Sequence, residues 1–127
     1  MKNKIFIFFL FAFINSPFLA NAQTEKLSQQ EIKSFILTET KEGGKLDFFT
    51  AIKGKEYNGA QVMKGIFMSN IEIALYKWGK ANFELGVENI ETALNIFKEF
   101  KGKELDMREK EIIPMGYRND LKNKSKE

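Results

Sequence analysis

Side chains that commonly carry out catalysis are scarce in this chain of 127 residues, which contains no His and no Cys. Without His, the usual general base, the commonest metal ligand and the group that titrates near neutral pH are all missing. Ser34 and Ser69 have no His to activate them, and neither lies in the G-x-S-x-G context of a strained nucleophile. We therefore expect no catalytic serine.

The carboxylates Asp106, Glu109 and Glu111 come close together in the sequence, as the acids of a hydrolase or a metal site would. They alternate with Arg108 and Lys110, which is typical of an ion-paired helix face in contact with water. No zinc, EF-hand, P-loop or dinucleotide-binding spacing occurs either. The sequence thus predicts no enzymatic activity, no metal and no cofactor.

The amino-terminal segment is typical of a secretory signal peptide. Lys2 and Lys4 precede an apolar run over residues 5–14, and the segment closes on the small-x-small site Ala20–Ala22. The run is shorter than the roughly 20 residues that cross a bilayer, and no Cys follows that could be acylated. We expect cleavage after Ala22 and a soluble, exported protein of the periplasm that begins at Gln23 and has no membrane anchor.

Removal of residues 1–22 leaves 18 Lys and Arg against 17 Asp and Glu, so the mature chain is close to neutral. This balance does not favour a nucleic-acid partner. Lys122, Lys124 and Lys126 alternate with Asn and Ser, which predicts a disordered basic tail over 122–127. The length of the remainder, 23–121, fits a single domain.

Helical patterns dominate this domain. Ser28 and Glu31 form a capping-box pattern before a helix over about 29–40, which the Gly43-Gly44 pair would stop. The run over 46–52 is short, and we favour a brief helix with a strand as the alternative.

The segment 60–78 is apolar on most sides of a helix, which is typical of a central, buried helix. Met68 and Glu72 lie on its narrow polar stripe. Gly65 and Ser69, one helical turn apart, form a ridge of small residues against which a second helix could pack closely. Gly79 is expected to cap this helix.

After a loop over 83–86, a helix is expected over 87–101, with Gly102 ending it. A charged helix over 104–113 should follow, and Pro114 should end or kink it. The sequence therefore predicts an all-α fold, a small bundle of four to five helices.

Function is expected to come from the protein surface, because no catalytic set is present. We place a partner-binding surface at Met68, Glu72, Trp78 and Phe83, since Trp and other large apolar side chains anchor protein interfaces. Trp78 and Phe83 have an alternative role, which is to close the core beside the central helix. A non-enzymatic binding protein is the expectation, and a homodimer is a further possibility.

Part of the sequence resembles the Tai-type amidase immunity proteins of type VI secretion. That family has a G-Y-x-x-G-x-x-D helix and an F-C-x-P-x-x-V loop before the next helix. Gly65, Ser69 and Glu72 stand at the Gly, Gly and Asp positions of the first motif. Phe83 stands at the Phe position of the loop motif, and the resemblance extends to Phe100.

The resemblance implies a periplasmic inhibitor that binds and plugs a cell-wall amidase toxin. Two departures concern the loop, where Glu84 replaces the Cys and Gly86 replaces the Pro, so that the family's disulfide cannot form. A small helical periplasmic stress chaperone and an accessory subunit of an envelope complex remain as alternatives, since both classes share this size and location.

Overall fold

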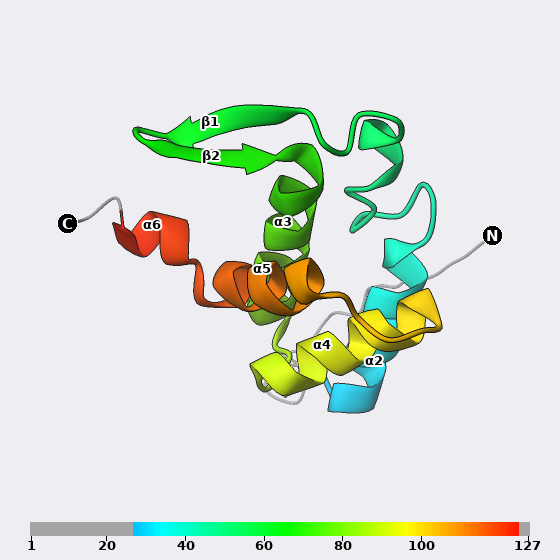
Figure 1. The fold of residues 1–127 in the computed structure, drawn as a ribbon. Coiled ribbons are helices and arrows are strands. Elements are labelled where there is room, and N and C mark those ends of the chain that lie inside the picture. Colours follow the sequence, from blue (N-terminus) through cyan, green and yellow to red (C-terminus); the bar gives the residue numbers. More distant parts are fainter. Residues whose placement is uncertain (1–26, 125–127) are drawn as a thin grey trace, which may run out of the picture.

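The computed structural model describes residues 27–124, so the predicted signal peptide and the end of the predicted tail, 125–127, lie outside the described residues. The described chain forms five α-helices, one 3-10 helix and a two-stranded antiparallel sheet (Figure 1). The expectation of a small, mainly helical domain is confirmed, and the sheet departs from the all-α prediction. None of the helices in this part of the chain has the length and apolar character of a membrane span.

Helix α2 (Gln29–Thr40) has the predicted bounds. The Ser28 hydroxyl accepts a hydrogen bond from the Glu31 N–H at 3.1 Å, and the Ser28 N–H donates to the Glu31 carboxylate at 2.9 Å. This reciprocal capping box satisfies two N–H groups that a helix start leaves without partners. Ile32 and Ile36 are buried against the rest of the domain.

Between α2 and the sheet, the chain forms turns and the 3-10 helix η1 (Thr50–Ile52). The Leu46 N–H donates to the Glu39 carbonyl at 2.9 Å, which folds this segment back onto the end of α2 and buries Leu46. The helix expected over 46–52 is thus reduced to three residues of 3-10 helix, and the strand alternative is wrong.

A β-hairpin replaces the first half of the helix predicted over 60–78. Strand β1 (Gly59–Met63) pairs with β2 (Ile66–Ser69), and a bulge falls at Val62. Gly65 lies in the turn with φ of 80°, a left-handed conformation that glycine adopts without steric cost. Gly65 and Ser69 therefore form no helix-packing ridge, because both precede the helix.

Helix α3 (Asn70–Leu85) begins directly after the hairpin. Ser69 is its N-cap: the Ser69 hydroxyl accepts from the Glu72 N–H, and the Ser69 N–H donates to the Glu72 carboxylate at 2.9 Å. Gly79 is not a C-cap but lies buried in the middle of the helix. The helix ends at Gly86, which adopts φ of 99°, so the loop predicted over 83–86 is mostly the last turn of α3.

Helix α4 (Ile90–Lys101) starts three residues later than predicted, because Asn89 caps it by accepting from the Thr92 N–H at 2.8 Å. Gly102 ends it in the left-handed conformation, as predicted.

Helix α5 (Met107–Arg118) begins three residues later than predicted and runs through Pro114, so of the two predicted effects of the proline, a helix end and a kink, the helix end is wrong. Packing against α3 holds the helix on both sides of the proline, although Pro114 supplies no N–H. Asn119 then adopts a left-handed conformation, and the short helix α6 (Asp120–Lys124) occupies part of the predicted tail.

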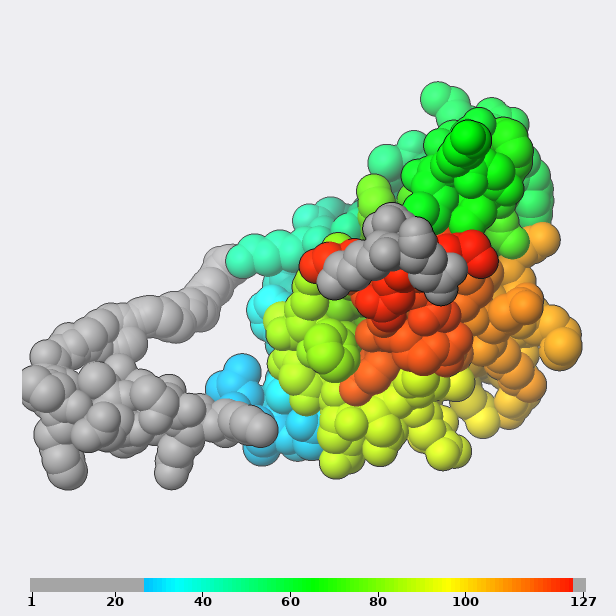
Figure 2. Space-filling model, turned by 90° about the vertical axis from the view of Figure 1, so that its left-hand side faces the viewer, coloured from blue at the N-terminus to red at the C-terminus, as the bar shows by residue number. Residues whose placement is uncertain are grey.

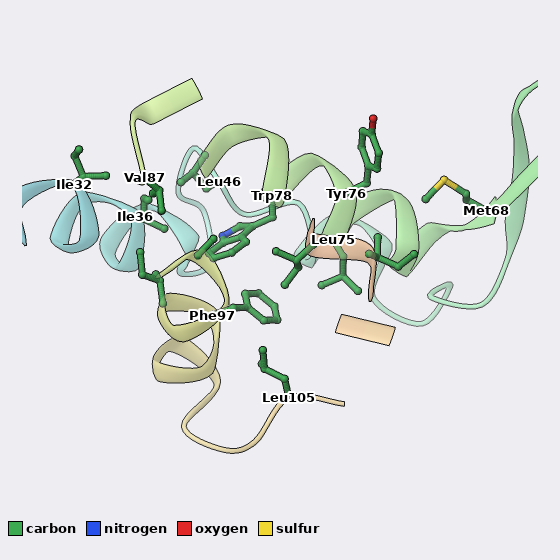
Figure 3. Packing of buried hydrophobic residues seen from close by; sticks show 14 residues of the cluster. Ile32, Ile36, Leu46, Met68, Leu75, Tyr76, Trp78, Val87, Phe97 and Leu105 are labelled. Carbon is green, nitrogen blue, oxygen red and sulfur yellow. The ribbon is translucent and has the colours of Figure 1, made fainter. Parts of the chain in front are cut away.

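Helices α3 and α5 cross at the centre of the domain, with α5 lying over α3 in Figure 1. Trp78 of α3 packs edge-on against Phe97 of α4, with ring centroids 4.8 Å apart (Figure 3). The Tyr76 hydroxyl donates to the Asn119 side chain at 2.8 Å and accepts from the Leu121 N–H at 2.9 Å, and so ties α3 to the α5–α6 junction. The α3 helix is central, as predicted, although it occupies 70–85 rather than 60–78.

Candidate protein-binding surface

Two of the four residues predicted to bind a partner are buried. Trp78 is 0% exposed, and its indole N–H donates to the Thr40 hydroxyl at 3.0 Å. Met68 is 6% exposed and belongs to the hydrophobic core; Figure 3 shows it beside the strand that leads into α3. The alternative role of Trp78 as a core residue is correct, and the predicted exposure of Met68 is wrong because Met68 lies on the inner face of a strand.

Glu72 and Phe83 are accessible, but they occupy opposite ends of α3. At about 1.5 Å of rise per residue, the two positions are separated by roughly 16 Å along the helix axis. Phe83 is 59% exposed and contacts the edge of Tyr117 at 5.3 Å between ring centroids. The four predicted residues therefore do not form one surface.

Glu72 instead contacts Arg108 of α5, which in turn contacts Tyr57 in the loop before β1. One carboxylate oxygen accepts from the Ser69 N–H, and the other lies 3.6 Å from Arg108 Nε of α5. The Arg108 guanidinium in turn lies over the ring of Tyr57, 5.7 Å from its centroid. The helix cap thus orients the carboxylate, and the carboxylate and the aromatic ring together hold the arginine.

Tyr57 is 78% exposed, yet its backbone is fixed on both sides. The Asn70 N–H donates to the Asn58 carbonyl at 2.7 Å, and the Ile71 N–H donates to the Glu56 carbonyl at 3.0 Å. The first N–H groups of α3 thus hold the residues on either side of Tyr57. A large aromatic side chain therefore projects into water from a rigid backbone.

We call this the Tyr57–Arg108 surface, formed by Tyr57, Glu72 and Arg108. Tyr and Arg are enriched in protein interfaces. The sequence shows Tyr57 in a loop between glycines, but the contact with Arg108 depends on how α5 packs. No spacing in the sequence indicates it.

Other polar groups have structural partners. The Thr50 side chain lowers the pKa of Asp47 to about 2, with further hydrogen bonds from the N–H groups of Gly43, Thr50 and Phe49, so that Asp47 is a carboxylate at neutral pH. Burial, and then the charge of Glu88, raise the pKa of Tyr117.

A hollow of about 380 Å³ lies between η1 and helices α3, α4 and α5, with Phe49, Phe97 and Phe100 among its lining residues. Lys101 and Glu109 form an ion pair in its wall, with Lys101 Nζ 2.6 Å and 2.7 Å from the two carboxylate oxygens. Glu109 also accepts from the Asp106 N–H at 2.8 Å as part of the α5 capping box. These two charges join α4 to α5.

Across residues 27–124, no group of three or more Asp and Glu side chains is placed to hold a metal ion.

Comparison with known proteins gives no relative from which a function could be transferred: no family model, no curated protein and no solved structure matches this chain.

Proposed function

We propose that this chain is an exported, non-enzymatic protein of the periplasm that binds a protein partner through the Tyr57–Arg108 surface. The observation that carries the proposal is the exposed ring of Tyr57, held between backbone hydrogen bonds to α3 and packed under Arg108. The exported location rests on the sequence pattern of residues 1–22.

The physical basis is preorganisation. Association costs free energy because side chains and loops lose conformational freedom at the interface. That cost is reduced here, since the backbone around Tyr57 and the side chain of Arg108 are already held in the free protein. Aromatic and arginine anchors of this type contribute about 2 kcal/mol or more when a partner buries them.

The more specific form of this proposal is that the partner is a cell-wall amidase toxin and that this chain is its immunity protein. Its support is the resemblance over residues 65–100. The first motif of that resemblance does not lie within one helix in this chain, because 66–69 form strand β2 and Glu72 lies in the first turn of α3. The support that remains for the immunity proposal is the resemblance in the segment Phe83–Val87, which leads from the end of α3 towards α4.

The binding surface can be tested without knowing the partner. A photo-crosslinking phenylalanine analogue placed at position 57 of the exported protein should link one abundant partner in living cells. The same analogue at position 35 of α2, which is also exposed and aromatic, is the matched control and should link none. Equal crosslinking at both positions, or none at position 57, would contradict the proposed surface.

The immunity proposal has a separate test, since immunity genes lie beside those of their toxins. The product of the neighbouring reading frame should kill cells when it is exported alone, and coexpression of this chain should restore growth. Tyr57→Ala and Arg108→Ala should each weaken binding of that product by about 30-fold, whereas Phe35→Ala, at an exposed position of α2, should not. A harmless neighbouring product that does not bind would overturn the immunity proposal and leave the crosslinking result unaffected.

A further inference from the structure

Asn58 and Gly59 lie where the loop that carries Tyr57 enters strand β1, and both residues are exposed. Figure 2 shows the hairpin that begins at Gly59, in green, at the upper end of the molecule. An Asn side chain reacts with the backbone nitrogen of the next residue when that nitrogen is accessible. A following glycine favours this reaction, because it has no side chain to shield the nitrogen.

The fold leaves the Gly59 nitrogen accessible. The Asn58 carbonyl accepts from the Asn70 N–H at 2.7 Å and therefore points toward the start of α3. The peptide bond between residues 58 and 59 is trans, so its N–H points in the opposite direction from its carbonyl. The Gly59 N–H thus points away from α3. Within the described chain, neither this N–H nor the Asn58 side chain has a hydrogen-bond partner.

The other asparagines lack this combination. Of all the asparagines in the chain, only Asn58 precedes a glycine. Asn95 is also exposed, but it lies within α4, where the N–H of the following residue is hydrogen-bonded along the helix. Asn89 and Asn119 hold their side-chain oxygens in hydrogen bonds. Sequence and fold together therefore single out Asn58.

We propose that Asn58 is a site of spontaneous deamidation. The Gly59 nitrogen attacks the side-chain carbonyl carbon of Asn58, and a new nitrogen–carbon bond forms as the bond to the amide nitrogen breaks. That nitrogen takes the proton of the Gly59 N–H and leaves as ammonia, so that a succinimide ring remains. Water then opens the ring. Opening at the side-chain carbonyl gives aspartate, and opening at the main-chain carbonyl gives isoaspartate.

The fold slows this reaction without preventing it. Ring closure fixes the rotation of the peptide plane between residues 58 and 59 about the Cα–C bond of Asn58. In the native protein, the hydrogen bond from the Asn70 N–H resists rotation of this plane. The bond lies at an exposed loop, where local opening needs less free energy than global unfolding. Asn58 therefore reacts in the native protein, although more slowly than in a denatured chain.

Isoaspartate changes how the loop before β1 is held. Its main chain runs through the former side chain, so the backbone gains one carbon atom. The carbonyl that accepted from the Asn70 N–H becomes a free carboxylate outside the main chain. One of the two backbone hydrogen bonds beside Tyr57 is then displaced, while the bond from the Ile71 N–H to the Glu56 carbonyl remains.

This change gives the Tyr57–Arg108 surface a form of regulation that rests on the function proposed above. The backbone beside Tyr57 is held before binding only while the Asn58 carbonyl keeps its place. Loss of that order raises the entropic cost of association, so the isoaspartate form binds a partner more weakly. The conversion is irreversible without a repair reaction, so binding declines with the age of the molecule.

Peptide mapping of the folded protein tests the site. After long incubation at mildly alkaline pH, mass spectrometry of proteolytic fragments should show aspartate and isoaspartate at position 58 and an intact Asn95. Gly59→Ala places a methyl group beside the attacking nitrogen, and Asn58 of this variant should stay intact over the same period. Its Cβ would lie 3.1 Å from the Met68 carbonyl oxygen, so thermal unfolding must show that the variant is folded.

Three outcomes would overturn the modification site: an unchanged Asn58 in the natural protein, equal conversion at Asn58 and Asn95, or equal conversion of the natural protein and a folded Gly59→Ala variant. None of these measurements needs a partner. A failure of crosslinking from position 57 would therefore contradict the proposed function and leave the modification site standing.

Hydrogen exchange tests the consequence for the loop. The isolated isoaspartate form should exchange the amide hydrogen of Asn70 faster than the unconverted protein. Asn58→Asp is the matched control, since it adds the same charge but keeps the main chain, and its Asn70 amide should exchange at nearly the natural rate. Equal exchange in the isoaspartate form and the unconverted protein would overturn the proposed regulation.

Discussion

Gly79 of α3 and Gly116 of α5 each lie against the backbone of the opposite helix. A Cβ atom on Gly79 would collide with the Ile113 carbonyl oxygen, and one on Gly116 would collide with the Tyr76 carbonyl oxygen. The two helices therefore meet backbone to backbone, and the small residues that the sequence suggested at Gly65 and Ser69 lie elsewhere in the fold.

Replacing either glycine by alanine should destabilise the protein. The atoms in the way belong to backbone carbonyls, which cannot move aside as flexible side chains do. We expect Gly79→Ala and Gly116→Ala each to lower the free energy of unfolding by about 1–3 kcal/mol, despite the better helix propensity of alanine. Urea denaturation measures this change. Lys80→Ala, at an exposed position of α3, is the control and should be close to neutral.

The hydrogen bond between Trp78 and Thr40 gives a second prediction. Thr40→Val keeps the shape of the side chain but removes the oxygen that accepts from the buried indole N–H, and an unpaired buried donor costs about 1–3 kcal/mol. Since Trp78 is the only tryptophan, its fluorescence reports unfolding directly. Thr38→Val, at an exposed position of the same helix, should have little effect; equal losses for both variants would contradict the assigned bond.

Asp47 should make stability depend on pH in the acid range. Its pKa is lowered from 3.8 to about 2 in the folded protein, so the folded state favours the carboxylate. The resulting stabilisation is present above about pH 4 and is lost as the pH falls toward 2. The free energy of unfolding of the natural chain should therefore fall over this window by more than that of Asp47→Asn, in which residue 47 does not titrate. Parallel pH profiles for the two proteins would show that Asp47 makes no such contribution.

Glu72 has a structural role in the capping box with Ser69, which has the same sequence pattern as that of Ser28 and Glu31. Glu72→Gln retains hydrogen bonding at the cap of α3 but removes the charge facing Arg108, whereas Glu72→Ala removes both. We expect Glu72→Ala to lower the melting temperature and Glu72→Gln to lower it less, since a helix cap contributes about 1 kcal/mol. A Glu72→Gln protein as unstable as Glu72→Ala would indicate that the charge, rather than the cap, dominates.

Local sequence information was sufficient for some elements. Helix α2 and the end of α4 follow from residues at their own boundaries, Ser28 with Glu31 and Gly102, whose effect does not depend on the rest of the fold. The hairpin does depend on it, because the apolar residues on both sides of Gly65 fit a strand and a buried helix equally well. The capping-box pattern of Ser69 and Glu72 is the local signal that the helix begins only at residue 70, and the packing of Met68 inward and the exposure of Phe67 agree with it.

The same limit applies to α5 and to the candidate surface. Pro114 predicts a helix end or a kink by its own chemistry, and contact with α3 holds the helix continuous through it. Tyr57 is identifiable as a loop aromatic, but Arg108 reaches it only after α5 has packed. Trp78 and Phe83 are close in the sequence, yet one is buried and the other exposed, because they lie on different faces of α3.

The crossing of Gly79 and Gly116 also has a consequence for the order of folding. The two glycines are separated in the chain by the whole of α4, so their contact closes a long loop, with an entropic cost that local helix formation does not carry. During synthesis, α3 emerges first and its glycine face stays without a partner until α5 has followed. A chain released before α5 is complete therefore exposes the backbone of its central helix, and the last third of the sequence decides whether the first two thirds reach the native state.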